Sequence, residues 1–88
     1  MAAGTLKVAI ISPERTVFEG DADMVVAPAW DGEVGVMRGH APLLVLLGDG
    51  VMRVTRGGSV ERFRVSGGFM QVVDDTVTVL SESADVSR

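Results

Sequence analysis

Residues 51–66 read VMRVTRGGSVERFRVS, and this stretch decides the fold class. The Gly-Gly pair at 57–58 is a strong signal for a two-residue hairpin turn, because such turns need positive φ. Pairing the residues that flank the turn places Met52 opposite Phe63, two candidate core side chains on one face. The opposite face then carries Arg53, Thr55, Val60, Arg62 and Arg64. Side chains alternate with period two, so a slip of one residue would bury these arginines, and the register is well specified.

Strand-length runs extend from this hairpin towards both ends of the chain. Sixteen valines favour strands, and eleven glycines cluster at the expected turns. No window of eleven or more residues has the apolar spacing of an amphipathic helix. The expected strands are residues 5–12, 16–19, 22–27, 33–36, 43–47, 51–56, 59–66, 69–73 and 76–81. Many short strands at even spacing predict an all-β fold, an antiparallel sandwich or barrel.

Two further turns follow from short polar dipeptides. Asp74-Asp75 is expected to close a hairpin that pairs Val72 with Val77 on the core face. Gly20-Asp21 is expected to separate the strand at 16–19 from the strand at 22–27. These turns complete a pattern with no linker, internal repeat or low-complexity tract, so one domain over residues 1–88 is predicted.

The composition narrows the classes of function. The chain has 88 residues, a net charge of −4, one histidine, no tyrosine and no cysteine. The absence of cysteine excludes a disulfide scaffold, a zinc-thiolate site and a thiol nucleophile. The negative charge argues against a nucleic-acid-binding protein. The longest leucine and valine run is too short to cross a bilayer, so we expect no insertion into a membrane. Few side chains of the types that usually act in catalysis remain, and no metal or cofactor is expected.

The segment 31–43, DGEVGVMRGHAPL, has features that folding alone does not require. Glycines at 32, 35 and 39 give the backbone more freedom than a simple strand needs. Glu33 and Arg38 stand between these glycines and His40 follows the last of them, while Asp31 begins the segment. Binding residues of a rigid β-sandwich usually lie in such connections, so this segment is the candidate binding region.

The same segment carries a family resemblance. Gly-Glu-x-Gly at 32–35, followed by Gly-His-Ala-Pro-Leu at 39–43, is similar to the ε subunit of F-type ATP synthases, in its N-terminal β-sandwich. Weaker matching pieces occur in the family's order and cover about residues 5–84. They are Ser12-Pro-Glu, Val17-Phe-Glu-Gly20, Gly50-Val-Met-Arg-Val54, Val65-Ser-Gly-Gly-Phe69 and Val77-Thr-Val-Leu80.

The resemblance implies a flattened antiparallel β-sandwich of ten strands at the foot of a central stalk. It implies a non-catalytic subunit that binds the γ subunit on one side and the c subunits of the membrane rotor ring below. Such a subunit rotates with both and couples ion flow to ATP synthesis. The implied location is peripheral, on the cytoplasmic face of a bacterial inner membrane, with an organelle membrane as the alternative. The implied interface with the rotor ring and γ consists of Asp31, Gly32, Glu33, Gly35, Arg38, Gly39, His40 and Pro42.

Several side chains have two readings. His40 is either an interface residue that titrates near neutral pH or a packed loop residue with one backbone hydrogen bond. Glu33 either pairs with a basic group of the ring or is solvated. Trp30 either anchors an interface or covers one end of the core. The arginine face is more readily an ordinary solvated face than a docking surface. On it, Arg53 directly opposite Arg62 requires a nearby acidic group.

Within the candidate segment, backbone shape is expected to matter more than charge. A surface ion pair contributes about 0–1 kcal/mol, whereas a β-branched residue at a glycine with positive φ costs roughly 1–3 kcal/mol. We therefore expect valine at Gly35 or Gly39 to be more damaging than Glu33→Gln or His40→Ala.

Two departures from the family pattern affect the expectations. Arg38 stands where relatives usually have proline, so the conformation of this connection is less fixed. The printed chain stops at Arg88, before the two helices with which longer relatives inhibit ATP hydrolysis. We therefore expect no helical domain in these residues and no ATP binding by them. A second hypothesis of function, a free-standing β-sandwich that binds a carbohydrate or peptide, has little aromatic surface to support it.

Overall fold

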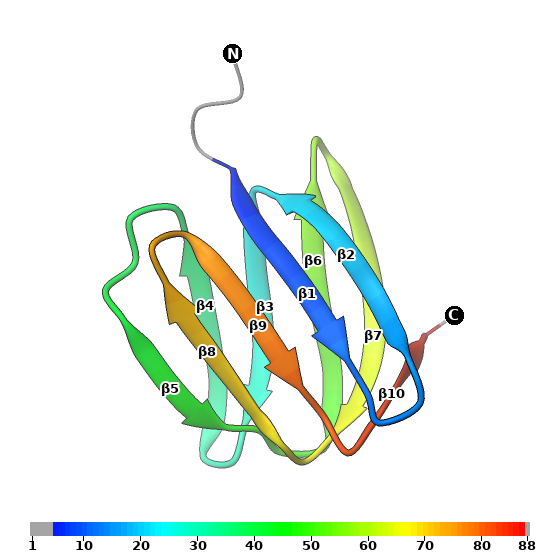
Figure 1. Cartoon of the computed structure of the whole chain (residues 1–88). Helices are drawn as coiled ribbons and strands as arrows, with labels where there is room; N and C mark the ends of the chain where they lie inside the picture. The colour runs from blue at the N-terminus through cyan, green and yellow to red at the C-terminus, as the bar shows by residue number, and fades with distance from the viewer. Residues whose placement is uncertain (1–4, 88) are drawn as a thin grey trace.

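The computed structural model describes residues 5–87, and their regular structure consists of β-strands. Ten strands form two five-stranded sheets that pack face to face (Figure 1). The first sheet has the order β2 (Thr16–Ala22), β1 (Leu6–Ile11), β9 (Thr76–Leu80), β8 (Phe69–Val73) and β5 (Leu43–Leu46). The second sheet has the order β10 (Ser83–Val86), β7 (Ser59–Ser66), β6 (Gly50–Arg56), β3 (Met24–Ala29) and β4 (Gly32–Met37). The predicted β-sandwich is confirmed.

Both predicted hairpin registers are confirmed. In the β6–β7 hairpin, Met52 pairs with Phe63 and both are buried. In the β8–β9 hairpin, Val72 pairs with Val77, also in the core. The residues of its turn, Asp74 and Asp75, have φ of 49° and 59°, a conformation that aspartate tolerates better than most residues. Local turn chemistry therefore sets the pairing of these four strands.

The core lies where the inner faces of the two sheets meet. Alternation along β1, β6, β8 and β9 buries every second side chain, as period-two geometry requires. The fully buried large side chains are Leu6, Ile10, Met52, Met70, Val25, Val36, Val54, Val65, Val72, Val77 and Val79. Both sheets contribute to this list, so each is held in place by the other.

The structure departs from the sequence-based expectations at three points. β2 continues through Gly20-Asp21, so the turn expected there is wrong; the chain reverses at Asp23, whose amide donates to the carbonyl of Thr55 at 2.7 Å. A tenth strand, β10, was not apparent as a run of its own and pairs with β7. β1 runs parallel to β9, an exception to the antiparallel pattern of the other neighbouring strands described. In the order of the first sheet, β9 of the β8–β9 hairpin lies next to β1 and runs in the same direction.

The crossing from β9 to β10 is organised by a buried hydroxyl. Ser81 is 4% exposed, and its Oγ accepts a hydrogen bond from the amide of Ser66 at 3.1 Å. The same Oγ lies 2.8 Å from the carbonyl of Ser83, to which it donates. Since Ser81 follows β9 of the first sheet and Ser66 ends β7 of the second, these bonds fasten one sheet to the other at this end.

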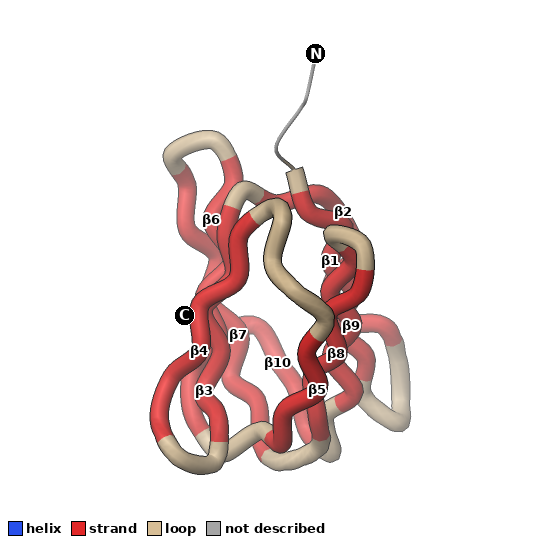
Figure 2. The backbone as a smooth tube through the Cα atoms, turned by 90° about the vertical axis from the view of Figure 1, so that its left-hand side faces the viewer, coloured by secondary structure: helices blue, strands red, loops and turns tan. Residues whose placement is uncertain are grey.

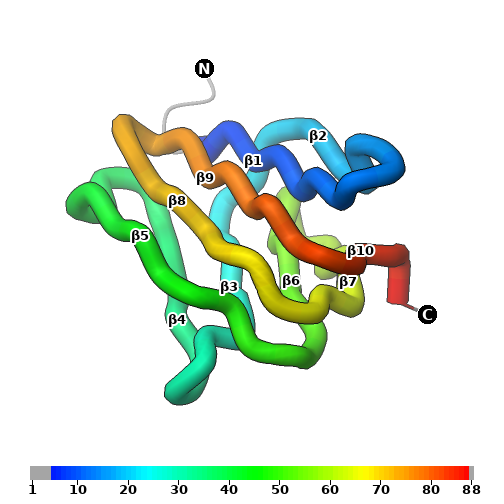
Figure 3. The backbone as a smooth tube through the Cα atoms, turned by 60° about the horizontal axis from the view of Figure 1, so that its bottom comes forward, coloured from blue at the N-terminus to red at the C-terminus, as the bar shows by residue number. Residues whose placement is uncertain are grey.

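The two long margins of the sandwich differ. At the β2 margin, the Phe18 and Phe63 ring centroids are 5.3 Å apart, and the Arg56 guanidinium lies 5.4 Å from the Phe18 ring. The opposite margin has the edge strands β4 and β5, one from each sheet (Figures 2 and 3). A single β-bridge between Ala29 and Leu47 joins the chain segments at one end of that margin. The candidate segment 31–42 runs along this second margin.

Candidate functional site

The segment 31–42 does not form one loop. Asp31 lies in the turn between β3 and β4, and the next six residues are β4 itself. Residues 38–42 then connect β4 of the second sheet to β5 of the first. Because a strand advances about 3.3 Å per residue, Asp31 and Arg38 lie roughly 20 Å apart, at opposite ends of the sandwich. The predicted site residues therefore form two separate groups.

The first group surrounds the β3–β4 turn. Trp30 is 69% exposed, which excludes the reading in which it covers the core. Its amide donates to the carbonyl of Leu46 at 3.1 Å, so the turn is hydrogen-bonded to the last residue of β5. Gly32 has φ of +140°, and Asp31 and Glu33 are exposed. This end of the sandwich thus presents one large aromatic side chain beside two carboxylates.

Glu33 has a partner within the chain. Nη1 of Arg53 donates to Oε2 of Glu33 at 3.4 Å, and both side chains are partly exposed. This carboxylate supplies the acidic group that the opposed pair Arg53 and Arg62 requires. Since the pair is long and exposed, its contribution to stability is about 0–1 kcal/mol.

The second group occupies the connection from β4 to β5. Gly39 has φ of +86°, and its amide donates to Oδ1 of Asp75 at 2.7 Å. The amide of His40 donates to the carbonyl of Met37 at 3.2 Å, which closes the turn. Nδ1 of His40 lies 2.7 Å from the carbonyl of Ala41 and donates to it. The ring therefore makes the backbone hydrogen bond of the packed-loop reading while the residue stays half-buried.

Gly35 does not behave as expected. It lies in the middle of β4, with extended backbone, and a Cβ added there would meet no atom within 4 Å. The expectation that valine at Gly35 strains the chain is therefore wrong, because that strain needs positive φ or a close neighbour. Gly39 keeps the expected positive φ. The requirement for glycine in this segment is concentrated at the connection, not along β4.

An exposed apolar surface was not among the predicted site residues. It covers the outer face of β5, β8 and β9 and is here named the apolar patch: Leu44, Leu46, Phe69 and Leu80. Leu44 and Leu46 are 69% and 63% exposed on an edge strand. Leu46 pairs with Phe69, which in turn pairs with Leu80, so the side chains are contiguous across three strands. The signal for it is the uninterrupted run 43–47, since a strand with one solvated face normally alternates with polar residues.

The outer face of the second sheet is different. On it, Arg53 pairs with Glu33, and Arg62 and Arg64 lie on the same face. Arg56 and Glu61, which pair at 2.8 Å, are in register with the buried face of the hairpin and lie at its end. Arg15, in the β1–β2 turn, pairs with Asp85 of β10 at 3.0 Å. This pattern fits the ordinary solvated face that the sequence favoured.

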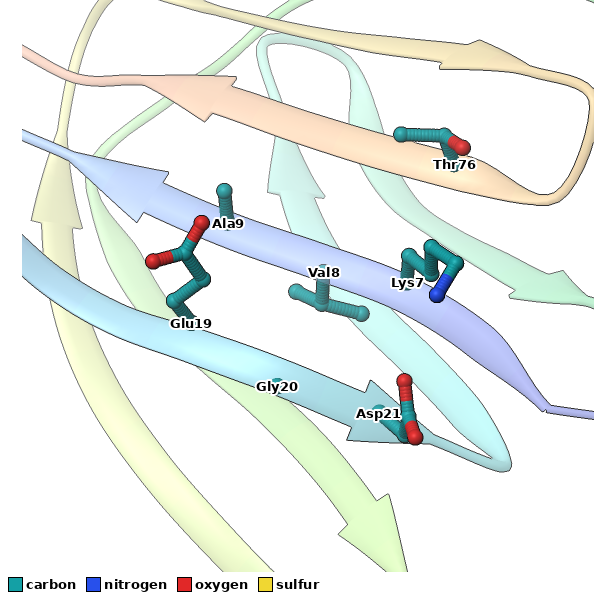
Figure 4. A pocket seen from close by; sticks show the side chains of 7 residues that line it. All are labelled: Lys7, Val8, Ala9, Glu19, Gly20, Asp21 and Thr76. Atoms are coloured by element: carbon teal, nitrogen blue, oxygen red, sulfur yellow. The ribbon is translucent and has the colours of Figure 1, made fainter.

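A hollow on the surface of the first sheet offers little chemistry. It lies over β1, β2 and β9, with a volume of about 360 Å³, and is lined by Lys7, Glu19, Asp21 and Thr76 (Figure 4). It is shallow and open, and its side chains supply no nucleophile with an adjacent base. Among residues 5–87, no three acidic or histidine side chains are grouped as metal ligands. The same residues include no helix long and apolar enough to cross a membrane.

Comparison with known proteins identifies the fold. The family model described as "ATP synthase, Delta/Epsilon chain, beta-sandwich domain" matches residues 5–86. The chain belongs to this family. The resemblance found in segments 32–35 and 39–43 is therefore confirmed over almost the whole length, and the sandwich described above is the delta/epsilon-type β-sandwich.

Curated members of the family include chains of two lengths. The ATP synthase epsilon chain of Desulfitobacterium hafniense is 42% identical over 83 residues, which are 94% of this chain and 63% of that protein. The ATP synthase epsilon chain of Frankia casuarinae is 48% identical over 83 residues, which are 93% of this chain and 98% of that protein. The chain thus spans less than two thirds of the first relative and nearly all of the second.

Solved structures agree on the fold of this delta/epsilon-type sandwich. A chain of the Euglena gracilis mitochondrial ATP synthase, in a structure of OSCP, F1 and c-ring, matches with a TM-score of 0.87 and 22% identity over 93% of this chain and 53% of that chain. A chain from a structure of the Tetrahymena thermophila mitochondrial ATP synthase central stalk and c-ring matches with a TM-score of 0.74 and 16% identity. The match covers 90% of this chain and 64% of that chain. At these identities the likeness establishes the fold.

Proposed function

We propose that this chain is a non-catalytic rotor subunit in the central stalk of a proton-translocating F-type ATP synthase. It joins the γ subunit to the c subunits of the membrane ring and couples rotation of the ring to ATP synthesis at distant sites. Membership of the delta/epsilon family supports this role. The observation that carries it is the apolar patch, because a contiguous apolar surface on a small soluble domain marks a protein interface.

The contact with the γ subunit is proposed to lie on the apolar patch and on the β4–β5 connection that precedes it. Arg38, Gly39, His40 and Pro42 lead directly into β5, which carries Leu44 and Leu46. Apolar side chains at the centre of an interface, with polar groups at its rim, are the usual arrangement of protein contacts. The connection with His40 then forms part of that rim.

The contact with the rotor ring is proposed to lie at the β3–β4 turn. Trp30 projects there beside Asp31, Gly32 and Glu33, and tryptophan is a frequent anchor of protein interfaces. The carboxylates suit basic groups on polar loops of the ring. Gly35, on the exposed face of β4 between the two groups, leaves room for a partner backbone to approach, because it has no side chain.

The proposed location follows from these partners. The chain is peripheral, on the cytoplasmic face of a bacterial inner membrane, and is held there by its contacts in the complex. It needs no cofactor for this role. The carbohydrate- or peptide-binding alternative is not favoured, since the family match accounts for the fold and the specific motifs together.

The test is reconstitution with the proposed partners. We expect the purified 88-residue chain to co-purify with γ, to show no ATP hydrolysis above a blank, and to bind ATP too weakly for calorimetry to detect. A chain that fails to bind γ, or a turnover that a change at Asp31, Glu33 or His40 abolishes, would contradict the proposal.

A further inference from the structure

One side chain of the first sheet holds the connection that precedes the apolar patch. The amide of Gly39 donates to Oδ1 of Asp75 at 2.7 Å, across 36 residues of sequence. Asp75 lies in the β8–β9 turn, which is adjacent to the β4–β5 connection at the same end of the molecule (Figure 1). A hydrogen bond to a carboxylate is shorter and stronger than one between neutral groups, and 2.7 Å is at the short end of the range.

The connection has few other restraints. Residues 38–42 lie outside both strands, β4 and β5. Their remaining hydrogen bonds in the described structure are local, from His40 to Met37 and Ala41. The bond to Asp75 is therefore the hydrogen bond that fixes these residues relative to the first sheet, which carries the apolar patch.

Asp75 is itself held rigidly. Its φ is 59°, and its carbonyl accepts a hydrogen bond from the amide of Lys7 at 2.9 Å. Asp74 shares the turn and has φ of 49°, but its hydrogen bond is from Oγ1 of Thr76 to its carbonyl. The two aspartates are thus alike in backbone conformation and differ in whether the carboxylate reaches Gly39.

The β6–β7 turn of the second sheet has a similar arrangement. Oδ2 of Asp23 accepts a hydrogen bond from the amide of Gly57 at 2.8 Å, and Gly57 also has positive φ, +53°. That pair fixes the β6–β7 turn, which lies outside the proposed interfaces. The molecule therefore contains a second aspartate–glycine pair that serves as an internal control.

We propose that Asp75 is a positioning residue for the γ contact: through Gly39 it holds residues 38–42 in the conformation that binds. Its carboxylate acts on the connection and does not itself need to touch γ. The effect on binding rests on the proposed function, whereas the effect on the conformation of Gly39 does not.

The test compares Asp75→Gly with Asp74→Gly. Glycine suits positive φ at both positions, so neither change strains the turn, and only the first removes the acceptor. Exchange of the Gly39 amide with deuterium, followed by NMR on the isolated chain, should speed up about tenfold or more in Asp75→Gly, as expected for loss of a charged acceptor. Asp74→Gly should leave this rate within about twofold.

Binding to γ supplies the second readout. We expect Asp75→Gly to weaken it about tenfold, with Asp74→Gly and Asp23→Ala close to the unsubstituted chain. Asp75→Asn, which keeps an acceptor oxygen and tolerates positive φ, should restore most of the affinity. Equal losses from both glycine variants, or an unchanged Gly39 exchange rate in Asp75→Gly, would overturn the inference. Absence of γ binding by the unsubstituted chain would instead refute the proposed function.

Discussion

The outer faces of the two sheets show opposite characters within one small domain. The outer face of the second sheet is charged: it carries Arg53, Arg62 and Arg64, and Arg53 pairs with Glu33. On the first sheet, the apolar patch lies open along an edge strand without charged residues. Edge strands of this kind are usually protected by charge, proline or a covering segment. The second-sheet face thus carries charged groups that water solvates, whereas the patch exposes apolar side chains, as expected of the partner surface proposed above.

The largest expected effect on stability comes from a substitution in the β7–β8 turn, which directly precedes Phe69 of the patch. Gly68 precedes Phe69, has φ of +89°, and an added Cβ would overlap the carbonyl oxygen of Leu80. Because that neighbour is backbone, Gly68→Ala forces the turn to move, and we expect a loss of about 3 kcal/mol or more in the free energy of unfolding. Urea denaturation measures it, with Gly35→Ala as the control in open space. A Gly68→Ala chain as stable as the control would contradict the packing described.

A second prediction separates two glycines of the candidate segment. Gly39→Val should cost roughly 1–3 kcal/mol at the connection, because valine is strained at positive φ, and should weaken γ binding. Gly35→Val, on extended β4, should leave the stability within about 0.5 kcal/mol. Thermal unfolding and ATP-driven proton pumping in membrane vesicles distinguish them. If valine at Gly35 destabilised the isolated chain more than valine at Gly39, the backbone account would fail.

The smallest effect is expected on the charged face. Glu33→Gln removes an exposed ion pair with Arg53, so it should lower the stability by at most about 1 kcal/mol and weaken assembly less than tenfold. The loss should diminish at high salt, where exposed charges are screened. Pumping measured at two ionic strengths checks this, with assembled complex quantified in parallel. Loss of all pumping in Glu33→Gln would mean that its carboxylate, rather than backbone shape, governs the ring contact.

The sequence predicts the local parts of this fold well. The glycine pair at 57–58 and the aspartate pair at 74–75 set the two hairpin registers, because turn geometry and face alternation act over a few residues. β10 was missed because it is four residues long and buries only Ala84. The parallel pairing of β1 with β9 depends on how distant hairpins return to a sheet, which local pattern does not specify.

The candidate site was predicted less completely. The sequence predicts segment 31–42 as one binding region, yet β4 divides it between two ends of the sandwich. The contact between Gly39 and Asp75 joins residues 36 positions apart and has no local signal. The apolar patch, by contrast, was detectable, because the run 43–47 shows no alternation on a strand that has two faces.

The most direct test of the central claim, that the apolar patch is a partner surface, is the affinity of γ for two serine variants. Leu46→Ser removes an exposed apolar side chain from the patch, and Val60→Ser removes one from β7 on the second sheet. Since burying a leucine contributes about 1.5–3 kcal/mol, calorimetry should show a loss of tenfold or more for Leu46→Ser. Val60→Ser should bind like the unsubstituted chain, with both variants folded by circular dichroism. Equal affinities for the two variants, or a greater loss for Val60→Ser, would contradict the assignment of the patch to γ.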